Sequence, residues 1–198
     1  MNLGPQPMTH EDRLQLANEI AIGIYGSLAR NTDTAYSDIE MKIIRGIPEH
    51  ASILTEIAVS AKRHWNYPEE WIQHWIPQLT ISAEYISSNE VWMMTDEEKP
   101  IAFYTLSQNE EGLWLDNLWV LPEYIGQGIG KTLFEHALER CKIKKISVLK
   151  IEADPNAQRF YEKMGAKQVS EHFTQVNGQA RRLPVMEMLL NIKKHLPS

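Results

Sequence analysis

Residues 113–130, LWLDNLWVLPEYIGQGIG, hold the pattern around which the rest of the chain is organised. Their first part is apolar on both faces, which is typical of a strand buried within a sheet. Pro122 and the glycine cluster of IGQGIG follow, and apolar residues then recur at helical spacing between Ile129 and Cys141. The pattern predicts a strand, a glycine-rich turn and a helix. Such a turn presents several backbone N–H groups at a helix N-terminus, where a phosphate or a pyrophosphate binds.

The glycine spacing excludes two common phosphate-binding patterns, because IGQGIG matches neither GxxxxGK[ST] nor GxGxxG. Instead, DNLWVLPEYIGQGIGKTLFEHAL resembles the acetyl-CoA-binding motif of the GNAT family of N-acetyltransferases, V-x-P-x-x-[RQ]-G-x-G-[IL]-G. A second motif of that family, DPNAQRFYEKMGA at residues 154–166, follows at the expected spacing. The resemblance covers about residues 41–192. It departs from the family at Ile125, which replaces the usual arginine or glutamine, so we expect somewhat weaker cofactor binding at a retained site.

The resemblance implies an α/β (α+β) GNAT fold, in which a mixed, mostly antiparallel central sheet is flanked by helices. The strand at residues 146–153 should splay apart from the strand that precedes the glycine turn, because the pantetheine arm slots between them like an added strand. The family usually has a bulge near Leu118 to Val120, which would direct the backbone N–H of Val120 at the thioester carbonyl. Simple alternation places Asp116 on the same strand face as Leu118 and Val120.

The resemblance also assigns site residues, with acetyl-CoA as the cofactor. The predicted cofactor-binding residues are Leu118, Val120, Gln127, Gly128, Ile129, Gly130, Lys131, Asn156 and Phe160. Among these, Asn156 bonds the pantetheine arm and Phe160 packs near the cofactor. Tyr161 approaches the sulfur and protonates the leaving thiolate.

The expected chemistry is direct attack of a substrate amine on the thioester. An alkyl ammonium has a pKa of roughly 10, so a base or a water chain must first accept its proton. Asp116 is the first candidate base, because a carboxylate often stands at this place in the family. The alternative for Asp116 is a polar strand residue that bonds backbone or water. A strand N–H group would stabilise the developing oxyanion.

The composition limits the classes of partner that the chain is expected to bind. A net charge of −6 argues against a nucleic-acid-binding surface and fits better with a cationic or amine substrate. The single cysteine, Cys141, excludes an intramolecular disulfide and is expected to be buried, which is consistent with a cytoplasmic location. No membrane partner is expected, because no long apolar run is present. A homodimer stays open.

The first forty residues carry a second resemblance, and we expect them to form an N-terminal appendage before a GNAT domain at residues 41–198. IYGSLARNTDTAYSDIEM is similar to the start of aminoglycoside nucleotidyltransferases. In that family Asp38 and Glu40 would bind magnesium, but here we favour the alternative that they are solvated carboxylates at a strand edge, and we expect no metal site. The later strands, the further catalytic carboxylate and the helical domain of that family do not follow, so we interpret the segment as a truncated helix–strand fragment.

The remaining pattern predicts the other elements. Residues 51–63 should form a helix. A second helix should follow, with Pro68 in its first turn and Pro77 at its end. These two helices form one wall of the acceptor pocket in the GNAT architecture. The aromatic residues within and before the second helix form either a cage for an amine or ordinary core: Trp65, Tyr67, Trp71 and Trp75. Further strands are expected at residues 42–45, 91–94, 101–106, 168–176 and 183–190, and a helix from residue 154.

The sequence therefore predicts an acetyl-CoA-dependent N-acetyltransferase that acts on a primary amine of a small molecule. The alternatives are a module that binds CoA without turnover and a nucleotidyltransferase remnant. The acceptor stays open among an aminoglycoside, a polyamine, an amino acid and a protein amine, since acceptor loops vary on a shared fold.

Overall fold

The computed structural model describes residues 41–191, so the predictions for residues 1–40 lie outside it. The elements, in chain order, are β1 Met41–Arg45, η1 Pro48–His50, α2 Ala51–Arg63, α3 Glu69–Leu79, α4 Ala83–Ser88, β2 Glu90–Asp96, β3 Lys99–Asn109, β4 Gly112–Val120, η2 Pro122–Tyr124, α5 Ile129–Ile143, β5 Val148–Glu152, α6 Gln158–Lys163, β6 Lys167–Val176 and β7 Gln179–Leu189. Within the described residues no helix is long and apolar enough to cross a membrane.

Within residues 41–191, seven strands form one sheet in the order β1-β2-β3-β4-β5-β7-β6. Only β4 and β5 run parallel, and every other neighbouring pair is antiparallel. The parallel pair needs a crossover, which α5 supplies on the way from β4 to β5. The predicted fold class, a mixed and mostly antiparallel sheet flanked by helices, is confirmed.

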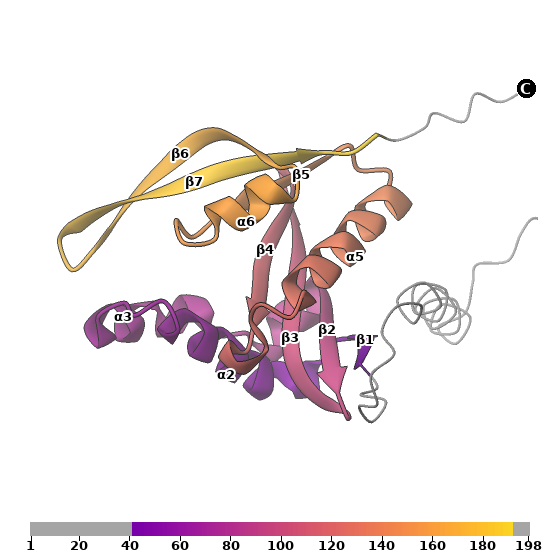
Figure 1. The fold of residues 1–198 in the computed structure, drawn as a ribbon, viewed down its shortest axis with the longest axis horizontal. Helices are drawn as coiled ribbons and strands as arrows, with labels where there is room; N and C mark the ends of the chain where they lie inside the picture. The colour runs from indigo at the N-terminus through magenta and orange to yellow at the C-terminus, as the bar shows by residue number, and fades with distance from the viewer. Residues whose placement is uncertain (1–40, 192–198) are drawn as a thin grey trace, which may run out of the picture.

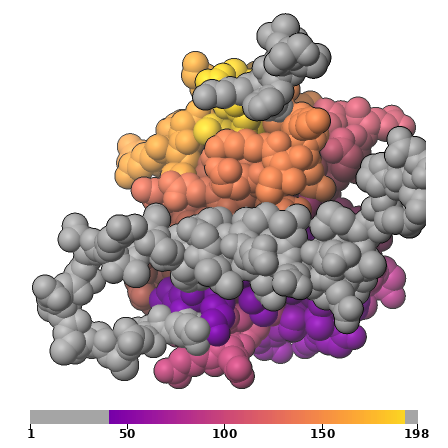
Figure 2. Space-filling model, turned by 90° about the vertical axis from the view of Figure 1, so that its right-hand side faces the viewer, coloured from indigo at the N-terminus to yellow at the C-terminus, as the bar shows by residue number. Residues whose placement is uncertain are grey.

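Two apolar cores lie on opposite faces of the sheet. On one face, α5 and α6 contribute Leu133, Phe134 and Tyr161, and the predicted buried thiol of Cys141 is confirmed there. On the other face, α2, α3 and α4 pack through Leu54, Ile57, Ile72 and Ile86. Figure 1 shows α2 and α3 to the left of the central strands and α5 to the right. Figure 2 shows the side on which α5 lies, with orange residues of the C-terminal half above the indigo β1 to α2 region.

Two predicted boundaries were wrong and one helix was missed, each for a local reason. The second helix does not end at Pro77 but continues to Leu79, because a proline costs one backbone hydrogen bond while the burial of Leu79 holds the last turn in place. The helix α4 was not predicted, although Ser82 caps it by accepting a hydrogen bond from the Tyr85 N–H at 3.1 Å. Residues 155–157 form a turn, so α6 begins at Gln158 and not at Asp154.

The bulge predicted near Leu118 to Val120 lies at Asp116 instead. On β3, Thr105 pairs with Asn117 while Leu106 pairs with Leu115, which leaves Asp116 as the extra residue of β4. An extra residue shifts the alternation of side chains along a strand. Leu115 and Leu118 therefore face the same α5 core, and the predicted shared face of Asp116 and Leu118 was wrong.

Candidate active site

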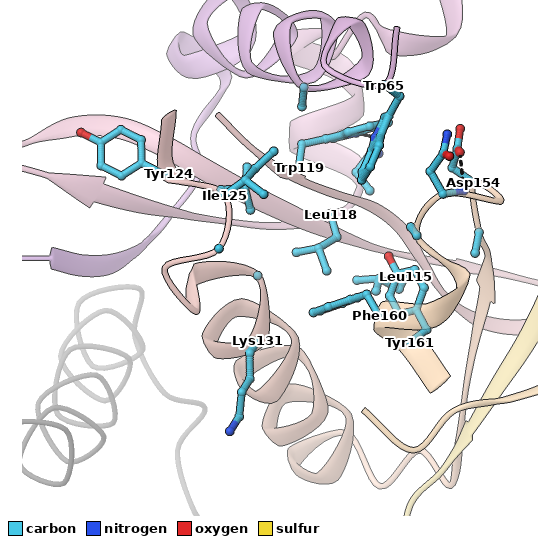
Figure 3. A pocket seen from close by; sticks show the side chains of 18 of the residues that line it. Trp65, Leu115, Leu118, Trp119, Tyr124, Ile125, Lys131, Asp154, Phe160 and Tyr161 are labelled. Carbon is cyan, nitrogen blue, oxygen red and sulfur yellow. Dashed lines mark hydrogen bonds between the residues drawn. The ribbon is translucent and has the colours of Figure 1, made fainter. Parts of the chain in front are cut away.

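The strands β4 and β5 pair over only two positions, Leu113 with Leu149 and Trp114 with Lys150. Beyond these positions β4 stays paired with β3 and β5 with β7, so the two central strands diverge. This is the splay that the sequence predicted. It opens a cavity of about 440 Å³, shown in Figure 3, which is within the usual range of roughly 300–1,000 Å³ for ligand sites.

The cavity joins the glycine turn to the helices on the other face of the sheet. Gly126 and Gly128 line one end, whereas Ala61 of α2 and Trp65 line the other. One continuous space therefore contacts both the predicted cofactor motif and the predicted acceptor wall.

The glycine turn leaves main-chain donors facing open space. Gly126 and Gly128 each have a φ of +85°, a left-handed conformation that glycine adopts without steric cost. A Cβ atom added to either glycine would meet no atom within 4 Å, so a ligand can approach the backbone. The first intrahelical bond of α5 runs from the Thr132 N–H to the Gly128 carbonyl at 3.0 Å. Three N–H groups before it have no partner within the helix, those of Ile129, Gly130 and Lys131.

The side chains of the turn add little positive charge to this anion site. The Gln127 amide donates to the Glu123 carbonyl at 2.9 Å, which holds it within the loop. The Lys131 ammonium lies 3.8 Å from a Glu135 carboxylate oxygen, and Figure 3 shows its side chain directed away from the strands. Ile125 lines the cavity where the family pattern has a polar side chain.

The free edge of β4 offers further main-chain groups. The Leu121 N–H donates to the Ile101 carbonyl of the β3 side at 2.9 Å. Because successive N–H groups of a strand point to opposite edges, those of Val120 and Leu118 face the gap toward β5. Both residues line the cavity. The Val120 N–H thus faces this gap because of the pairing of β4 with β3, without a bulge at that residue.

Phe160 and Tyr161 of α6 form the third side of the gap, with ring centroids 5.0 Å apart. Tyr161 is only 7% exposed, and its hydroxyl has no hydrogen-bond partner among residues 41–191. Burial, with the nearby Asp154 charge, raises the pKa of Tyr161 well above its ordinary value. The hydroxyl therefore keeps its proton and can donate it into the cavity.

Asn156 lies beside α6, and its side-chain amide bonds a residue of the predicted acceptor wall. Its Nδ2 donates to the Tyr67 hydroxyl at 2.9 Å, and its backbone N–H donates to Asp154 Oδ1 at 3.0 Å. Asn156 also lines the cavity. Its predicted contact with pantetheine would therefore compete with Tyr67.

Asp116 is exposed at the bulge and lines the cavity. Its Oδ2 accepts hydrogen bonds from the Tyr85 hydroxyl and from Asn117 Nδ2, the latter at 3.4 Å. The Tyr85 hydroxyl also lies 2.8 Å from Thr105 Oγ1. Burial, followed by the charge of Asp116, raises the pKa of Tyr85, which keeps this hydroxyl a donor. The candidate base is thus held by neutral groups.

The predicted aromatic cage is occupied by cations of the protein itself. Lys62 Nζ lies 4.4 Å from the Trp75 ring centroid, and Arg181 Cζ lies 4.6 Å from the same ring. Trp75 is buried in the core between α2, α3 and the sheet, so the core-packing alternative describes it. Trp65 differs, because it lines the cavity and is 37% exposed.

A charged cluster holds this wall against the cofactor motif. The Asp154 carboxylate lies 2.5 Å from Lys62 Nζ and 3.5 Å from Arg181 Nη2, and it accepts a hydrogen bond of 2.8 Å from the Tyr67 hydroxyl. Burial alone would raise the pKa of Asp154, but the charge and hydrogen bond of Lys62 outweigh it and lower that pKa. Burial, aided by Asp154, raises the pKa of Tyr67 to about 12.

The sequence analysis missed Tyr85, which bonds Asp116, and Glu152, which lines the cavity. Tyr85 lies on α4, for which the capping Ser82 was the only signal. Glu152 ends β5 and lines the cavity, with its Oε2 atom 2.7 Å from His172 Nδ1. Strand alternation from Lys150 would have placed Glu152 on the acceptor face.

A diverging pair of central strands, beside a glycine turn at a helix N-terminus and a buried tyrosine, defines an acyltransferase that binds CoA. Residues 56–187 match the family model described as "Acetyltransferase (GNAT) domain". The chain belongs to the GNAT family of N-acetyltransferases, and acetyl-CoA is its acyl donor. The open glycine turn, the unpaired edge of β4 and the cavity fit that group.

The chain is similar to several known proteins. It is 30% identical over 108 residues to the peptidyl-lysine N-acetyltransferase YjaB of Salmonella typhimurium, covering 54% of this chain and 69% of the relative. A PaiA N-acetyltransferase of Thermoplasma acidophilum, solved in complex with coenzyme A, shares the fold with a TM-score of 0.64 and 23% identity, over 77% of this chain and 100% of that chain.

A third match concerns the nucleotidyltransferase resemblance. An aminoglycoside nucleotidyltransferase (4') of Staphylococcus aureus is 42% identical over 59 residues, and the match covers 23% of this chain and 23% of the relative. The chain spans less than a quarter of that enzyme. Asp38 and Glu40 lie outside the described residues, so the role of this segment stays a prediction.

Proposed function

We propose that the chain transfers the acetyl group of acetyl-CoA to a primary amine of a small molecule by direct attack. The observation that carries the proposal is one cavity that contacts the glycine turn, the unpartnered Tyr161 hydroxyl and the Asp116 carboxylate. When bound, acetyl-CoA supplies the acetyl group as an activated thioester.

The residues of the turn and of the splayed strands would hold the cofactor. The N–H groups of Ile129, Gly130 and Lys131 would bind the diphosphate at the N-terminus of α5. The edge of β4 at Leu118 and Val120 would pair with the pantetheine arm as with an added strand.

The geometry of the cavity supports the following catalytic roles. Asp116, oriented by Tyr85, accepts the proton of the substrate ammonium directly or through a water molecule. The Val120 N–H donates to the carbonyl oxygen as the C–N bond forms. Tyr161 gives its proton to the sulfur as the C–S bond breaks, and it regains a proton through water from the nitrogen, which loses its second proton as the amide forms. The products are an amide, the CoA thiol and one released proton.

A protein lysine is the second candidate acceptor, because the relative from Salmonella typhimurium is named a peptidyl-lysine N-acetyltransferase. The non-catalytic alternative is a module that binds CoA without turnover. Ile125 supports this alternative, because isoleucine removes a side-chain contact to the cofactor. A cytoplasmic location is supported by the single cysteine, Cys141, which allows no intramolecular disulfide. A homodimer stays a prediction, which light scattering can check.

The test combines CoA binding by calorimetry with thiol release in the presence of an amine panel. We expect CoA to bind and at least one amine to release thiol. The variant Tyr161→Phe should bind CoA within about twofold of the wild type and lose about 100-fold or more in kcat. Absence of CoA binding would reject the proposal, whereas binding without thiol release for any small amine or lysine peptide would favour the non-catalytic module.

A further inference from the structure

Each of the diverging strands carries a carboxylate just beyond the last paired position. That position joins Trp114 to Lys150, and the Lys150 ammonium lies 5.5 Å from the Trp114 ring centroid, so the two side chains share a face. Glu152 follows Lys150 by two residues and therefore projects on this face as well. Asp116, at the bulge, reaches the same face, because it contacts Tyr85 of α4. Both carboxylates line the cavity.

Neither carboxylate is neutralised by a lysine or an arginine of the described chain. The partners of Asp116 are Tyr85 and Asn117, which are uncharged. Glu152 uses one oxygen toward His172, and its other oxygen has no partner among residues 41–191.

The third carboxylate of the cavity differs, because Asp154 is neutralised by Lys62 and Arg181. Among residues 41–191, Lys131 is the only lysine or arginine that lines the cavity, and it lies at the glycine turn. Negative charge is therefore left over at the acceptor end, where Asp116 and Glu152 lie.

The Tyr161 hydroxyl marks where a ligand reacts in this space. The Tyr161 residue is only 7% exposed and lines the same cavity, and its hydroxyl, which Figure 3 shows directed into that space, has no hydrogen-bond partner among the described residues. Trp65, on the acceptor side, lines the cavity and is partly exposed, and an indole ring attracts a cation.

We infer that the acceptor is an alkyl amine that carries a second cationic centre. The reacting nitrogen lies beside Asp116, and the second cation binds Glu152 with the Trp65 ring nearby. An amino acid that carries a carboxylate in place of the second cation is disfavoured, because like charges then face each other. This inference rests on the proposed acetyl transfer and names the substrate class of that same cavity.

The test uses three acceptors of equal chain length: an alkyl diamine, the alkyl monoamine and the amino acid with a terminal amine. Thiol release should give the diamine a kcat/KM about tenfold or more above the monoamine, as expected for a hydrogen-bonded charge pair, and the amino acid should rank last. Calorimetry of the three compounds on the CoA-bound protein should give the same order of affinity. The diamine advantage should shrink as salt is added.

The variant Glu152→Gln should lower the ratio of diamine to monoamine toward one in both measurements. The matched control is Glu171→Gln, which removes the same charge at a residue that pairs with Arg182 and does not line the cavity, and it should keep the ratio. A monoamine or an amino acid used as well as the diamine, or a ratio unchanged by Glu152→Gln, would overturn the inference while leaving acetyl transfer intact. Failure of the protein to bind CoA would instead contradict the proposed function.

Discussion

The Tyr85 hydroxyl donates a hydrogen bond to the Asp116 carboxylate, and this contact joins α4 to the bulge of β4. The bulge turns Asp116 and Asn117 toward the same helix, so the candidate base is positioned by a residue outside both GNAT motifs. The contact therefore connects the irregularity of the strand to the proposed proton transfer.

Removal of this contact should slow the reaction without affecting the cofactor. We expect Asp116→Asn to lower kcat by about 100-fold, the usual size of a general-base effect, and Tyr85→Phe to lower it by a smaller factor. The double variant should be no slower than Asp116→Asn alone, because Tyr85 acts through Asp116. CoA affinity should stay within about twofold in all three variants. Additive losses would indicate that Tyr85 contributes independently of Asp116.

Alanine variants of two glycines with similar backbone conformations should distinguish an effect on cofactor binding from an effect on folding stability. Gly128 has a φ of +85° at the turn before α5, and Gly178 has a φ of +77° in the β6–β7 turn, with open space around both. Replacing either by alanine should cost about 1–2 kcal/mol of stability, because a Cβ atom strains the left-handed conformation. Only Gly128→Ala should also weaken CoA binding, by about tenfold, since its methyl group enters the anion site. Equal CoA affinity of the two variants would contradict that location.

The local pattern of glycine and apolar residues predicted the glycine turn, and the resemblance of the two motifs to the GNAT family implied the sheet and the splay. The bulge was misplaced, because pairing with β3 sets its position, and no pattern within β4 reports that pairing. The charged cluster was also out of reach, since Lys62, Asp154 and Arg181 are brought together only by the fold. Trp75 could be read as a cage or as core until the structure placed Arg181 against it.

Two substitutions in the charged cluster of Lys62, Asp154 and Arg181 should differ in their cost in unfolding free energy. Asp154→Asn leaves Lys62 and Arg181 buried without their counter-charge, which should cost about 3–5 kcal/mol of unfolding free energy. Lys62→Met leaves Asp154 with Arg181 and the Tyr67 hydroxyl, so its cost should be clearly smaller. Urea unfolding measures both values. A larger loss for Lys62→Met would show that the lysine, and not the carboxylate, holds the wall together.

A buried histidine should make stability depend on pH. His136 is 7% exposed and lies 2.7 Å from the Tyr104 hydroxyl, and burial, followed by the charge of Arg140, lowers its pKa from 6.5 to about 4. The unfolded chain therefore binds the proton first as pH falls. Stability should be full above pH 6.5 and fall by about 2–3 kcal/mol by pH 4.5.

Glu90, near His136, does not add to the change in stability between pH 6.5 and 4.5. Burial alone would raise the pKa of Glu90, but hydrogen bonds from Lys144 and Trp92 outweigh burial and lower it to about 2. Its contribution to stability is lost only below pH 4.5.

The control for the histidine prediction is His136→Gln, which keeps a polar partner for Tyr104 but does not titrate. Unfolding of this variant should show a flatter slope between pH 6.5 and 4.5, and an unchanged slope would assign the dependence to other groups.

The departure at Ile125 provides a gain-of-function prediction. The residue is 41% exposed and lines the cavity next to the glycine turn, so a longer polar side chain fits without loss of core. Ile125→Arg should lower the Kd for CoA by about three- to tenfold, because a guanidinium adds charge-assisted hydrogen bonds to the diphosphate. The gain should diminish at high salt, and the neutral control Ile125→Leu should bind like the wild type. Unchanged binding by the arginine variant would place the diphosphate away from the start of the glycine turn.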